Sequence, residues 1–415
     1  MVTTEVPAPL LSADLLERFR ARAAGYDAAN AFPQEDFDEL VALGYLRAAV
    51  PVAQGGLGLG MRQIAALQSR LATAAPATAL AVNMHLVWTV TASLLAARGD
   101  DSLRLVLDDA AAGEVFAFGV SEPGNDLVLF DSVTEAAPDG AGGYRYTGTK
   151  IFTSLSPVWT RLGVFGRTPS DEIAHGFLRR DDGGHESLGD WDTVGMRATQ
   201  SHTTRLTGAH VPASRIVRVL PVGPSADPLV FGIFAAFETL VAAVYRGIAR
   251  RALDLAVEAA TARTSRRTGE STAADPVVRW RIADAAIDLD GLEPQVDTIA
   301  QELDDLVDNG PDWFPRLVGL KVRATETATR VVDRAVTVAG GSSYRADTEL
   351  GRLYRDVLAG RFHPSSTDSA HATVASRWLG PVGGPAGGGP TGGGGPTGGG
   401  GPTGGGPDAE AADER

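Results

Sequence analysis

The sequence predicts an α+β fold in which helices and strands occupy separate blocks. Apolar residues recur at helical spacing in the first 113 residues and again beyond residue 228, whereas short strand-like runs broken by Gly and Pro lie between them. Segregated blocks are typical of α+β proteins, because alternating strands and helices would instead indicate a parallel sheet. No GxGxxG motif follows a predicted strand, so a Rossmann dinucleotide site is not expected.

The first block, residues 1–113, is expected to form an N-terminal helical domain. One helix begins after Pro33 and ends before Gly44, and a second follows a glycine-rich loop at 55–58. A third helix, over residues 78–97, is apolar on nearly all sides and is therefore expected to be buried. The apolar positions expected to face the core from the first two helices are Phe37, Leu40, Val41, Ile64, Leu67 and Leu71.

The central block, residues 114–220, is expected to be a β-domain built as a small barrel or sandwich. Tyr144 and Tyr146 alternate with polar residues after a turn-rich segment, and further strand-like runs lie at 162–165 and 203–206. Closely spaced Gly and Pro residues separate these runs, so the strands are expected to be short.

The C-terminal block, residues 221–380, is expected to be a helical bundle. Long segments with helical apolar spacing cover 234–263, 277–303 and 312–339. The remaining residues, 381–415, are rich in Gly, Pro and Thr and have almost no apolar side chain to bury. They are therefore expected to form a flexible tail.

Composition limits the classes of function. The net charge of −14 argues against nucleic acid as the main partner, and the absence of cysteine excludes disulfides, thiolate catalysis and Cys-ligated metal sites. No stretch reaches the ~18 unbroken apolar residues of a membrane helix, and no basic region followed by an apolar run opens the chain. We therefore expect a cytoplasmic protein with no membrane span and no resident metal. Its expected substrate is a small molecule or an acyl thioester.

Five short motifs follow one another in the order and spacing of one known family. They are GGLG at 55–58, VSEPG at 120–124, GTKIFTS at 148–154, WDTVGMR at 191–197, and GG at 340–341 followed by LYRD at 353–356. Each motif alone is weak, but the ordered set resembles the acyl-CoA dehydrogenase superfamily over essentially residues 10–380. The resemblance implies a central β-domain between an N-terminal helical domain and a C-terminal four-helix bundle. It also implies FAD between these domains and a homotetramer or homodimer formed through the bundle.

Four residues carry the expected contacts to the flavin ring. A flavin ring is a flat apolar body with a polar edge, so its site needs aromatic walls and short hydrogen-bonding groups. The resemblance places these contacts at Phe118, Ser121, Phe152 and Ser154, on two predicted strands. Taken singly, the phenylalanines could equally be β-core residues and the serines turn residues.

The resemblance places the phosphate contacts further along the chain. Arg263 aligns with the family's flavin-pyrophosphate arginine, and Gly340 and Gly341 would bring backbone close to the cofactor of a neighbouring subunit. Residues 263–267 could equally be a solvated basic helix end, because the Phe-Gly that normally follows the arginine is absent. FMN or a diffusible reduced flavin is therefore the alternative to FAD.

The base of the family's dehydrogenases is missing from both of its usual places. These enzymes use a buried Glu to take a proton from the carbon beside the thioester. Pro364 stands at the more common position and Phe237 at the other. Glu238 follows Phe237, but one step along a helix turns a side chain by about 100°, so Glu238 is an unlikely base.

Two histidines indicate a different chemistry. His363 and His85 match positions where a flavin-monooxygenase branch of the same fold carries histidines, which can move a proton near neutral pH. Either one alone could equally be a structural residue. Three functions stay open: the family's default dehydrogenation of an acyl thioester, O2-dependent monooxygenation by reduced flavin with both histidines, and a non-catalytic flavin-binding subunit. An electron-transfer protein or a flavin reductase would be the redox partner.

Overall fold

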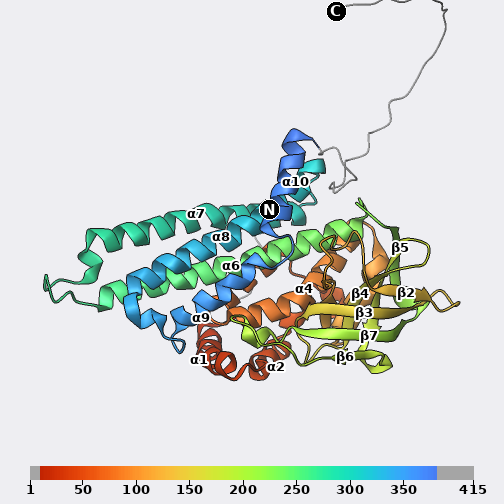
Figure 1. The fold of residues 1–415 in the computed structure, drawn as a ribbon, viewed down its shortest axis with the longest axis horizontal. Coiled ribbons are helices and arrows are strands. Elements are labelled where there is room, and N and C mark those ends of the chain that lie inside the picture. Colours follow the sequence, from red (N-terminus) through yellow and green to blue (C-terminus); the bar gives the residue numbers. More distant parts are fainter. Residues whose placement is uncertain (1–9, 381–415) are drawn as a thin grey trace, which may run out of the picture.

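The computed structural model describes residues 10–380 and shows helices, then a sheet, then helices (Figure 1). The expected tail at 381–415 lies outside these residues. The N-terminal helices are α1 (Ala13–Ala29), α2 (Gln34–Ala42), α3 (Met61–Ala72), α4 (Pro76–Ala97) and α5 (Arg104–Ala111).

The N-terminal region differs from the sequence expectation in two details. Helix α1, which the apolar pattern did not predict, begins where the Ser12 side chain accepts a hydrogen bond from the Leu15 amide, and it buries Leu15, Leu16 and Phe19 among many charged residues. Val41 was expected in the core, but its side chain is 45% exposed. The other five expected core positions of α2 and α3 are buried.

The central residues form one mixed sheet of eight strands. The strands are β1 (Phe116–Gly119), β2 (Glu135–Pro138), β3 (Tyr144–Thr153), β4 (Arg161–Arg167), β5 (Glu172–Arg179), β6 (His185–Ser187), β7 (His202–Val211) and β8 (Ile216–Pro221). Their order is β6-β7-β3-β2-β4-β5-β8, with β1 parallel to β4. Strands β5 and β7 also touch, so the sheet is curved around its own small core, which includes Tyr146, Trp159 and Leu162.

Three long helices dominate the C-terminal region: α6 (Pro228–Ala262), α7 (Pro276–Asp304) and α8 (Trp313–Ala339). The shorter α9 (Glu349–Asp356) and α10 (Thr367–Leu379) follow. Asp227 caps α6 and Asp275 caps α7, each followed by a proline at the first helical position, where no amide hydrogen is needed. These capping residues explain why both helices begin where they do.

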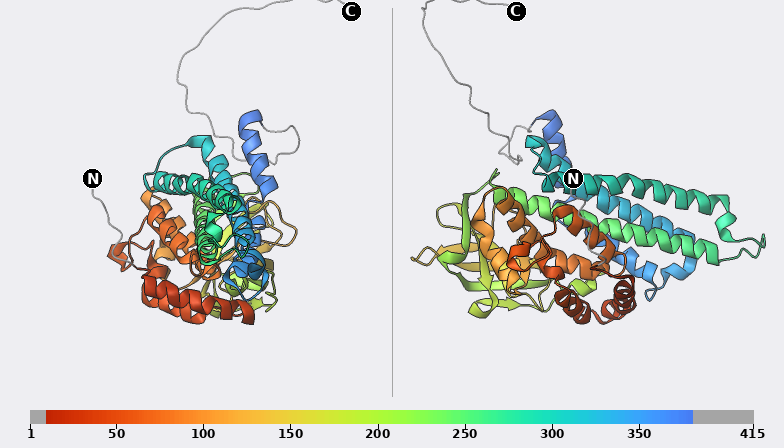
Figure 2. Two further views of the ribbon diagram at one scale, coloured as in Figure 1. Left: turned by 90° about the vertical axis from the view of Figure 1, so that its left-hand side faces the viewer. Right: turned by 180° about the vertical axis from the view of Figure 1, so that it is seen from behind.

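Helix α6 connects the bundle to the rest of the protein. It packs against α3, α4, α7 and α8, and the sheet lies at one end of the molecule while the far ends of α6, α7 and α8 extend away from it (Figures 1 and 2). Helices α4 and α6 are long and apolar enough to cross a membrane, but 89% and 83% of their apolar windows are buried inside the protein. They are therefore core helices.

Candidate active site

A cavity of about 440 Å³ lies between the sheet, α4, α6 and the segment that follows α9. This volume is within the range of about 300–1,000 Å³ that is typical of small-molecule sites. Its walls come from Leu80 and Met84 of α4, from Phe237 of α6, from the segments at 118–121, 152–154 and 191–201, and from residues 355–364. Segments far apart in the sequence therefore meet at one site.

All four residues expected to contact a flavin ring line this cavity. Phe118 stacks on Phe237 with ring centroids 5.6 Å apart, and Ser121 and Ser154 also face the cavity. The Ser154 hydroxyl lies 2.7 Å from the Ser201 hydroxyl, which adds a further polar group to the same wall. Flat apolar walls beside short hydroxyl groups fit a flavin ring with its polar edge.

The end of strand β3 has an unusual backbone that directs its side chains to the cavity. Phe152 has φ of 58°, in the left-handed region that bulky residues rarely adopt, at an irregularity in the pairing of β3 with β7. The Ser154 amide donates to the Phe152 carbonyl at 2.9 Å, so the chain turns sharply here. Strain of this kind is often found at functional sites, where the surrounding fold maintains it.

Trp191 is a lining residue that no sequence-based expectation assigned to the site. Its ring lies edge-on to Phe152, with centroids 6.1 Å apart, and its indole nitrogen donates to the Met196 carbonyl. Trp191 opens the WDTVGMR motif, so the signal was present in the sequence. Thr199 and Ser201, which also line the cavity, follow that motif with no comparable signal.

A buried ion pair fixes the ring-side segments to each other. Lys150 Nζ donates to Glu122 Oε1 at 2.6 Å and to the Phe165 carbonyl at 2.8 Å. Burial alone would raise the pKa of Glu122, but Lys150 holds it at about 2, while burial lowers the pKa of Lys150 to about 8. Both groups are therefore charged at pH 7. The pair joins Ser121, which precedes Glu122, to the strand that carries Phe152.

His363 and the adjacent Pro364 line the cavity from the segment that follows α9. Its Nε2 atom lies 2.9 Å from the Tyr245 hydroxyl of α6. Burial and, after it, the charge of Lys321 lower the pKa of His363 to about 3. The imidazole is therefore neutral at pH 7.

Glu238 does not line the cavity, whereas its neighbour Phe237 does. The Glu238 carboxylate is fully buried, and its Oε1 atom accepts hydrogen bonds from the amide and the hydroxyl of Ser365, each at 3.1 Å. Burial raises the pKa of Glu238 to about 8. Glu238 therefore supports the loop that carries His363 and does not face the cavity itself.

The structure contradicts the expectation that His85 moves a proton. Its Nε2 atom lies 2.7 Å from the Leu46 carbonyl, and its Nδ1 atom accepts from the Phe116 amide at 3.0 Å. The ring is fully buried and outside the cavity lining, and burial lowers its pKa to about 4. Because backbone groups occupy both ring nitrogens, His85 connects the N-terminal helices to the sheet.

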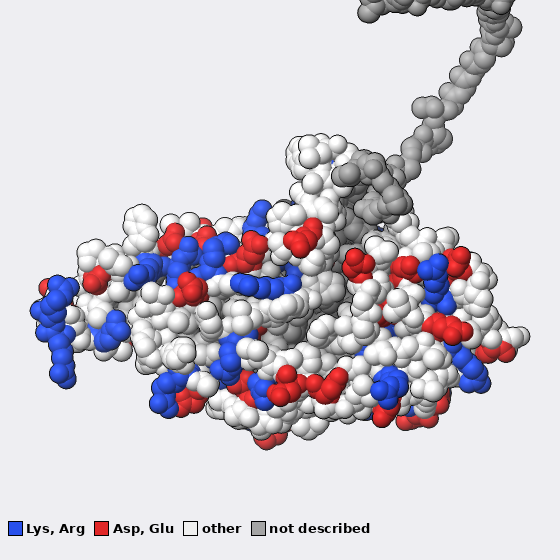
Figure 3. Space-filling model, in the orientation of Figure 1, with Lys and Arg blue, Asp and Glu red and all other residues white. Residues whose placement is uncertain are grey.

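Arg263, Gly340 and Gly341 lie together, but away from this cavity. The Arg263 guanidinium donates to the Ala339 carbonyl beside Gly340, where φ of 74° requires glycine. Arg263 comes directly after α6, 26 residues beyond the cavity residue Phe237, and the helix between them spans about 39 Å. Basic side chains gather at this far end of the bundle (Figure 3). These three residues therefore do not reach the cavity of their own chain.

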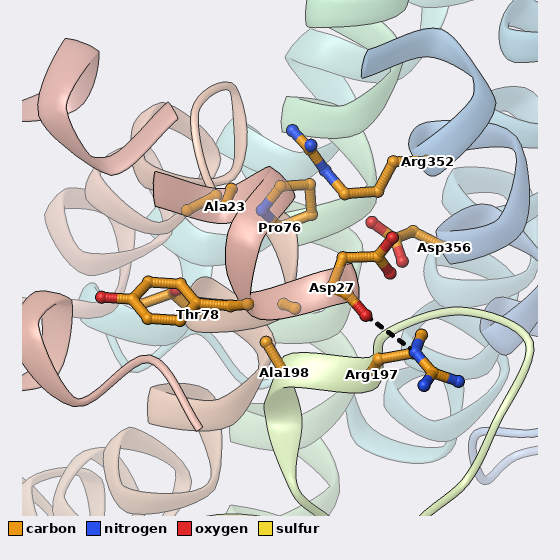
Figure 4. Close-up of a pocket in the computed structure, with 11 residues that line it drawn as sticks. Ala23, Asp27, Pro76, Thr78, Arg197, Ala198, Arg352 and Asp356 are labelled. Carbon is orange, nitrogen blue, oxygen red and sulfur yellow. Dashed lines mark hydrogen bonds between the residues drawn. The ribbon is translucent and has the colours of Figure 1, made fainter. Parts of the chain in front are cut away.

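A second hollow is a crevice between α1, α4 and α9 with room for one water molecule, about 10 Å³ (Figure 4). Four buried polar atoms that line it have no hydrogen-bond partner among the described residues: Tyr26 Oη, Asp27 Oδ1, Arg352 Nε and Asp356 Oδ2. A single water can bridge such a set, and nothing larger fits. Across residues 10–380 no cluster of three or more potential metal ligands is present.

Comparison with known proteins identifies relatives along most of the chain. The family model described as "Acyl-CoA dehydrogenase, N-terminal domain" matches residues 14–114, and that described as "Acyl-CoA dehydrogenase, C-terminal domain" matches residues 239–367. L-evernosamine nitrososynthase from a Micromonospora species is 30% identical over 362 residues, which are 85% of each chain. Benzylmalonyl-CoA dehydrogenase from Aromatoleum aromaticum is 27% identical over 344 residues, covering 82% of this chain and 88% of that protein.

A solved structure extends the similarity to the fold. KijD3 in complex with FMN and dTDP-3-amino-2,3,6-trideoxy-4-keto-3-methyl-D-glucose has a TM-score of 0.79 at 29% identity, covering 89% of this chain and 92% of that one. The sequence and structural relatives thus include both an FMN complex and a CoA-ester dehydrogenase.

Proposed function

The chain belongs to the acyl-CoA dehydrogenase family of flavin-dependent oxidoreductases, and on this premise we propose that it is a monooxygenase that uses reduced flavin and O2. The observation that carries the proposal is the absence of a buried carboxylate from the cavity lining within the described residues, together with the presence there of a neutral histidine, His363.

Dehydrogenation of a thioester needs a carboxylate that faces the substrate and has a raised pKa. Asp192 is the carboxylate that lines the cavity, but its side chain is 83% exposed and pairs with Arg197. Glu238 has a raised pKa, but its carboxylate is bound to Ser365 and lies outside the lining. Neither group meets both requirements.

The residues of the cavity have distinct roles in the proposed reaction. Ser121 and Ser154 hold the polar edge of the flavin, and Phe118 and Phe152 enclose its faces. A reduced flavin supplies the electrons that activate O2. His363 lines the cavity from the segment that follows α9, where it can hydrogen-bond the reacting oxygen or the substrate.

The relatives support this proposal and define the second candidate. One relative is a nitrososynthase by name, which favours oxygen chemistry. A related solved structure is an FMN complex, which favours FMN or a diffusible reduced flavin over FAD. Under this proposal a flavin reductase is the redox partner. Dehydrogenation of an acyl thioester is the second candidate, because the same ring-side residues would serve it and a CoA-ester dehydrogenase is also a relative.

We also propose that the chain forms a homotetramer or homodimer through its C-terminal helices. Trp280 and Ile287 of α7 are seven residues apart, so they share one face, and their side chains are 75% and 70% exposed. In such an assembly Arg263 and Gly340 would contact the cofactor of a neighbouring subunit.

An anaerobic experiment separates the two reactions. Enzyme loaded with oxidised FAD or FMN is mixed with a series of acyl-CoA compounds, and the flavin absorbance is followed. The proposal predicts no bleaching. Enzyme loaded with reduced flavin is then mixed with O2, and a transient absorbance band that differs from both oxidised and reduced flavin is expected. Rapid bleaching by an acyl-CoA would overturn the proposal in favour of dehydrogenation.

A further inference from the structure

We propose that Tyr245 is a positioning residue that fixes the tautomer of His363, so that Nδ1 carries the hydrogen and donates it into the cavity. The catalytic role of this hydrogen bond rests on the proposed function, but the tautomer itself can be measured without any activity. It assigns His363 the role of a neutral donor and not that of a base.

The direction of the hydrogen bond follows from the surroundings of the Tyr245 hydroxyl. Tyr245 is fully buried, and His363 Nε2, at 2.9 Å, is the acceptor for its hydroxyl among the described residues. Burial raises the pKa of Tyr245 well above 10, so the hydroxyl keeps its proton. A buried hydroxyl donates to an available acceptor, because leaving the proton unpaired is costly. Nε2 is therefore the nitrogen that carries no hydrogen.

The second ring nitrogen faces a different environment. His363 Nδ1 has no hydrogen bond to another described residue, and the residue lines the cavity. In a neutral imidazole one nitrogen donates and the other accepts. Since Nε2 accepts from Tyr245, Nδ1 is left as a donor for whatever occupies the cavity.

The backbone on both sides of the imidazole is fixed, so the ring cannot easily turn away. Lys321 Nζ of α8 donates to the carbonyls of His363 and Ser365 at 2.9 and 2.8 Å, and Glu238 accepts from the Ser365 amide. A Cβ at Gly360 would lie 2.9 Å from the Tyr245 ring, so glycine lets the loop pack directly on the tyrosine. The loop is therefore held from beneath by α6 and α8.

Titratable groups from three helices lie around this site. Lys321 approaches from α8, Tyr245 and Glu238 from α6, and Asp356 from α9 acts on Tyr245. The positive charge of Lys321 and burial both disfavour an imidazolium. A neutral hydrogen-bond donor held in a fixed position stabilises negative charge that develops on a reacting oxygen. It does not need to give up its proton to do so.

The test is the nitrogen spectrum of His363 in protein labelled with ¹⁵N-histidine, without flavin and with reduced flavin. His363→Gln identifies the resonances. The proposal predicts a neutral ring protonated at Nδ1 from pH 5 to 8. Protonation at Nε2, or an imidazolium at pH 7, would overturn it. This readout is independent of turnover, so a failed monooxygenase assay would leave it standing.

Two variants test the contribution of Tyr245. Tyr245→Phe removes the donor, and a mixture of both tautomers is expected. Tyr146→Phe is the matched control, because Tyr146 is equally buried and its hydroxyl donates to the Ala174 carbonyl within the β-domain. An unchanged tautomer in Tyr245→Phe would show that Tyr245 does not fix it. Once a substrate is known, kcat of Tyr245→Phe should fall about fivefold, as expected for one lost hydrogen bond, with KM unchanged.

Discussion

Replacing Lys150 by methionine should destabilise the protein much more than replacing a surface arginine. Methionine keeps most of the length of the lysine side chain but removes the ammonium that pairs with Glu122. Both partners are completely buried, so no water can replace the lost charge. Breaking such a pair by removing one member leaves an uncompensated charge in the interior.

The structure indicates the size of the effect. Glu122 keeps four other donors after the substitution: Ser132 Oγ at 2.7 Å, Asn125 Nδ2 at 2.8 Å, Val133 N at 2.9 Å and Thr134 N at 3.1 Å. Removing one partner of a buried pair costs about 3–5 kcal/mol. Because four hydrogen bonds to the carboxylate remain, we expect the lower end, about 3 kcal/mol. The Ile151 amide also donates to the Ser121 carbonyl at 2.9 Å, so loosening this region should weaken flavin binding about tenfold.

Urea denaturation at pH 7 and a flavin titration measure the two effects. Arg205→Met is the control, because the Arg205–Glu186 pair has side chains that are 52% and 62% exposed, and such pairs contribute less than about 1 kcal/mol. The Lys150→Met, Glu122→Gln double variant should cost less than the sum of the single variants, because it leaves no unpaired charge. Equal losses of stability in Lys150→Met and Arg205→Met would refute the reasoning.

Two further predictions concern a cavity wall and a buried histidine. Gly195→Ala should destabilise the protein by about 1–3 kcal/mol and weaken flavin binding, because its Cβ would lie 2.2 Å from the Arg355 carbonyl oxygen. Gly319→Ala on α8, with open space around it, should instead be stabilising by about 0.5–1 kcal/mol; equal effects in denaturation would contradict this. Burial lowers the pKa of His175 from 6.5 to about 3. Below pH 6.5 the unfolded state therefore binds a proton that the folded state does not. Wild-type protein should lose about 2 kcal/mol more than His175→Gln between pH 7 and pH 5, and equal losses would show that His175 is not buried neutral.

Local patterns were sufficient for the fold class, because they reflect the backbone directly. Helical apolar spacing located α3, α4, α6, α7 and α8, and Gly and Pro marked the short strands between them. Helix α1 could not be located in this way because it buries few apolar side chains among many charged ones, so its apolar stripe is narrow. Val41 was predicted to be buried but is exposed. It follows the buried Leu40 directly, and adjacent residues of a helix point in different directions.

The motifs also indicated four residues that the structure places in the cavity lining. Phe118, Ser121, Phe152 and Ser154 belong to short segments whose residue types are dictated by the site itself, so their chemistry is visible without a structure. Trp191 could have been predicted in the same way, because it belongs to the WDTVGMR motif. Tyr245 was not, because a tyrosine on an apolar helix looks like any other core residue.

Local sequence patterns were therefore enough to predict separate blocks of helix and strand and a set of residues suited to a flavin ring. Which polar residues line the cavity depends on how distant segments pack together. His85 and His363 look alike in the sequence, yet backbone groups occupy both nitrogens of His85 whereas one nitrogen of His363 is left for the cavity. The physical reason is that hydrogen-bond partners come from segments distant in the chain, which no local pattern records.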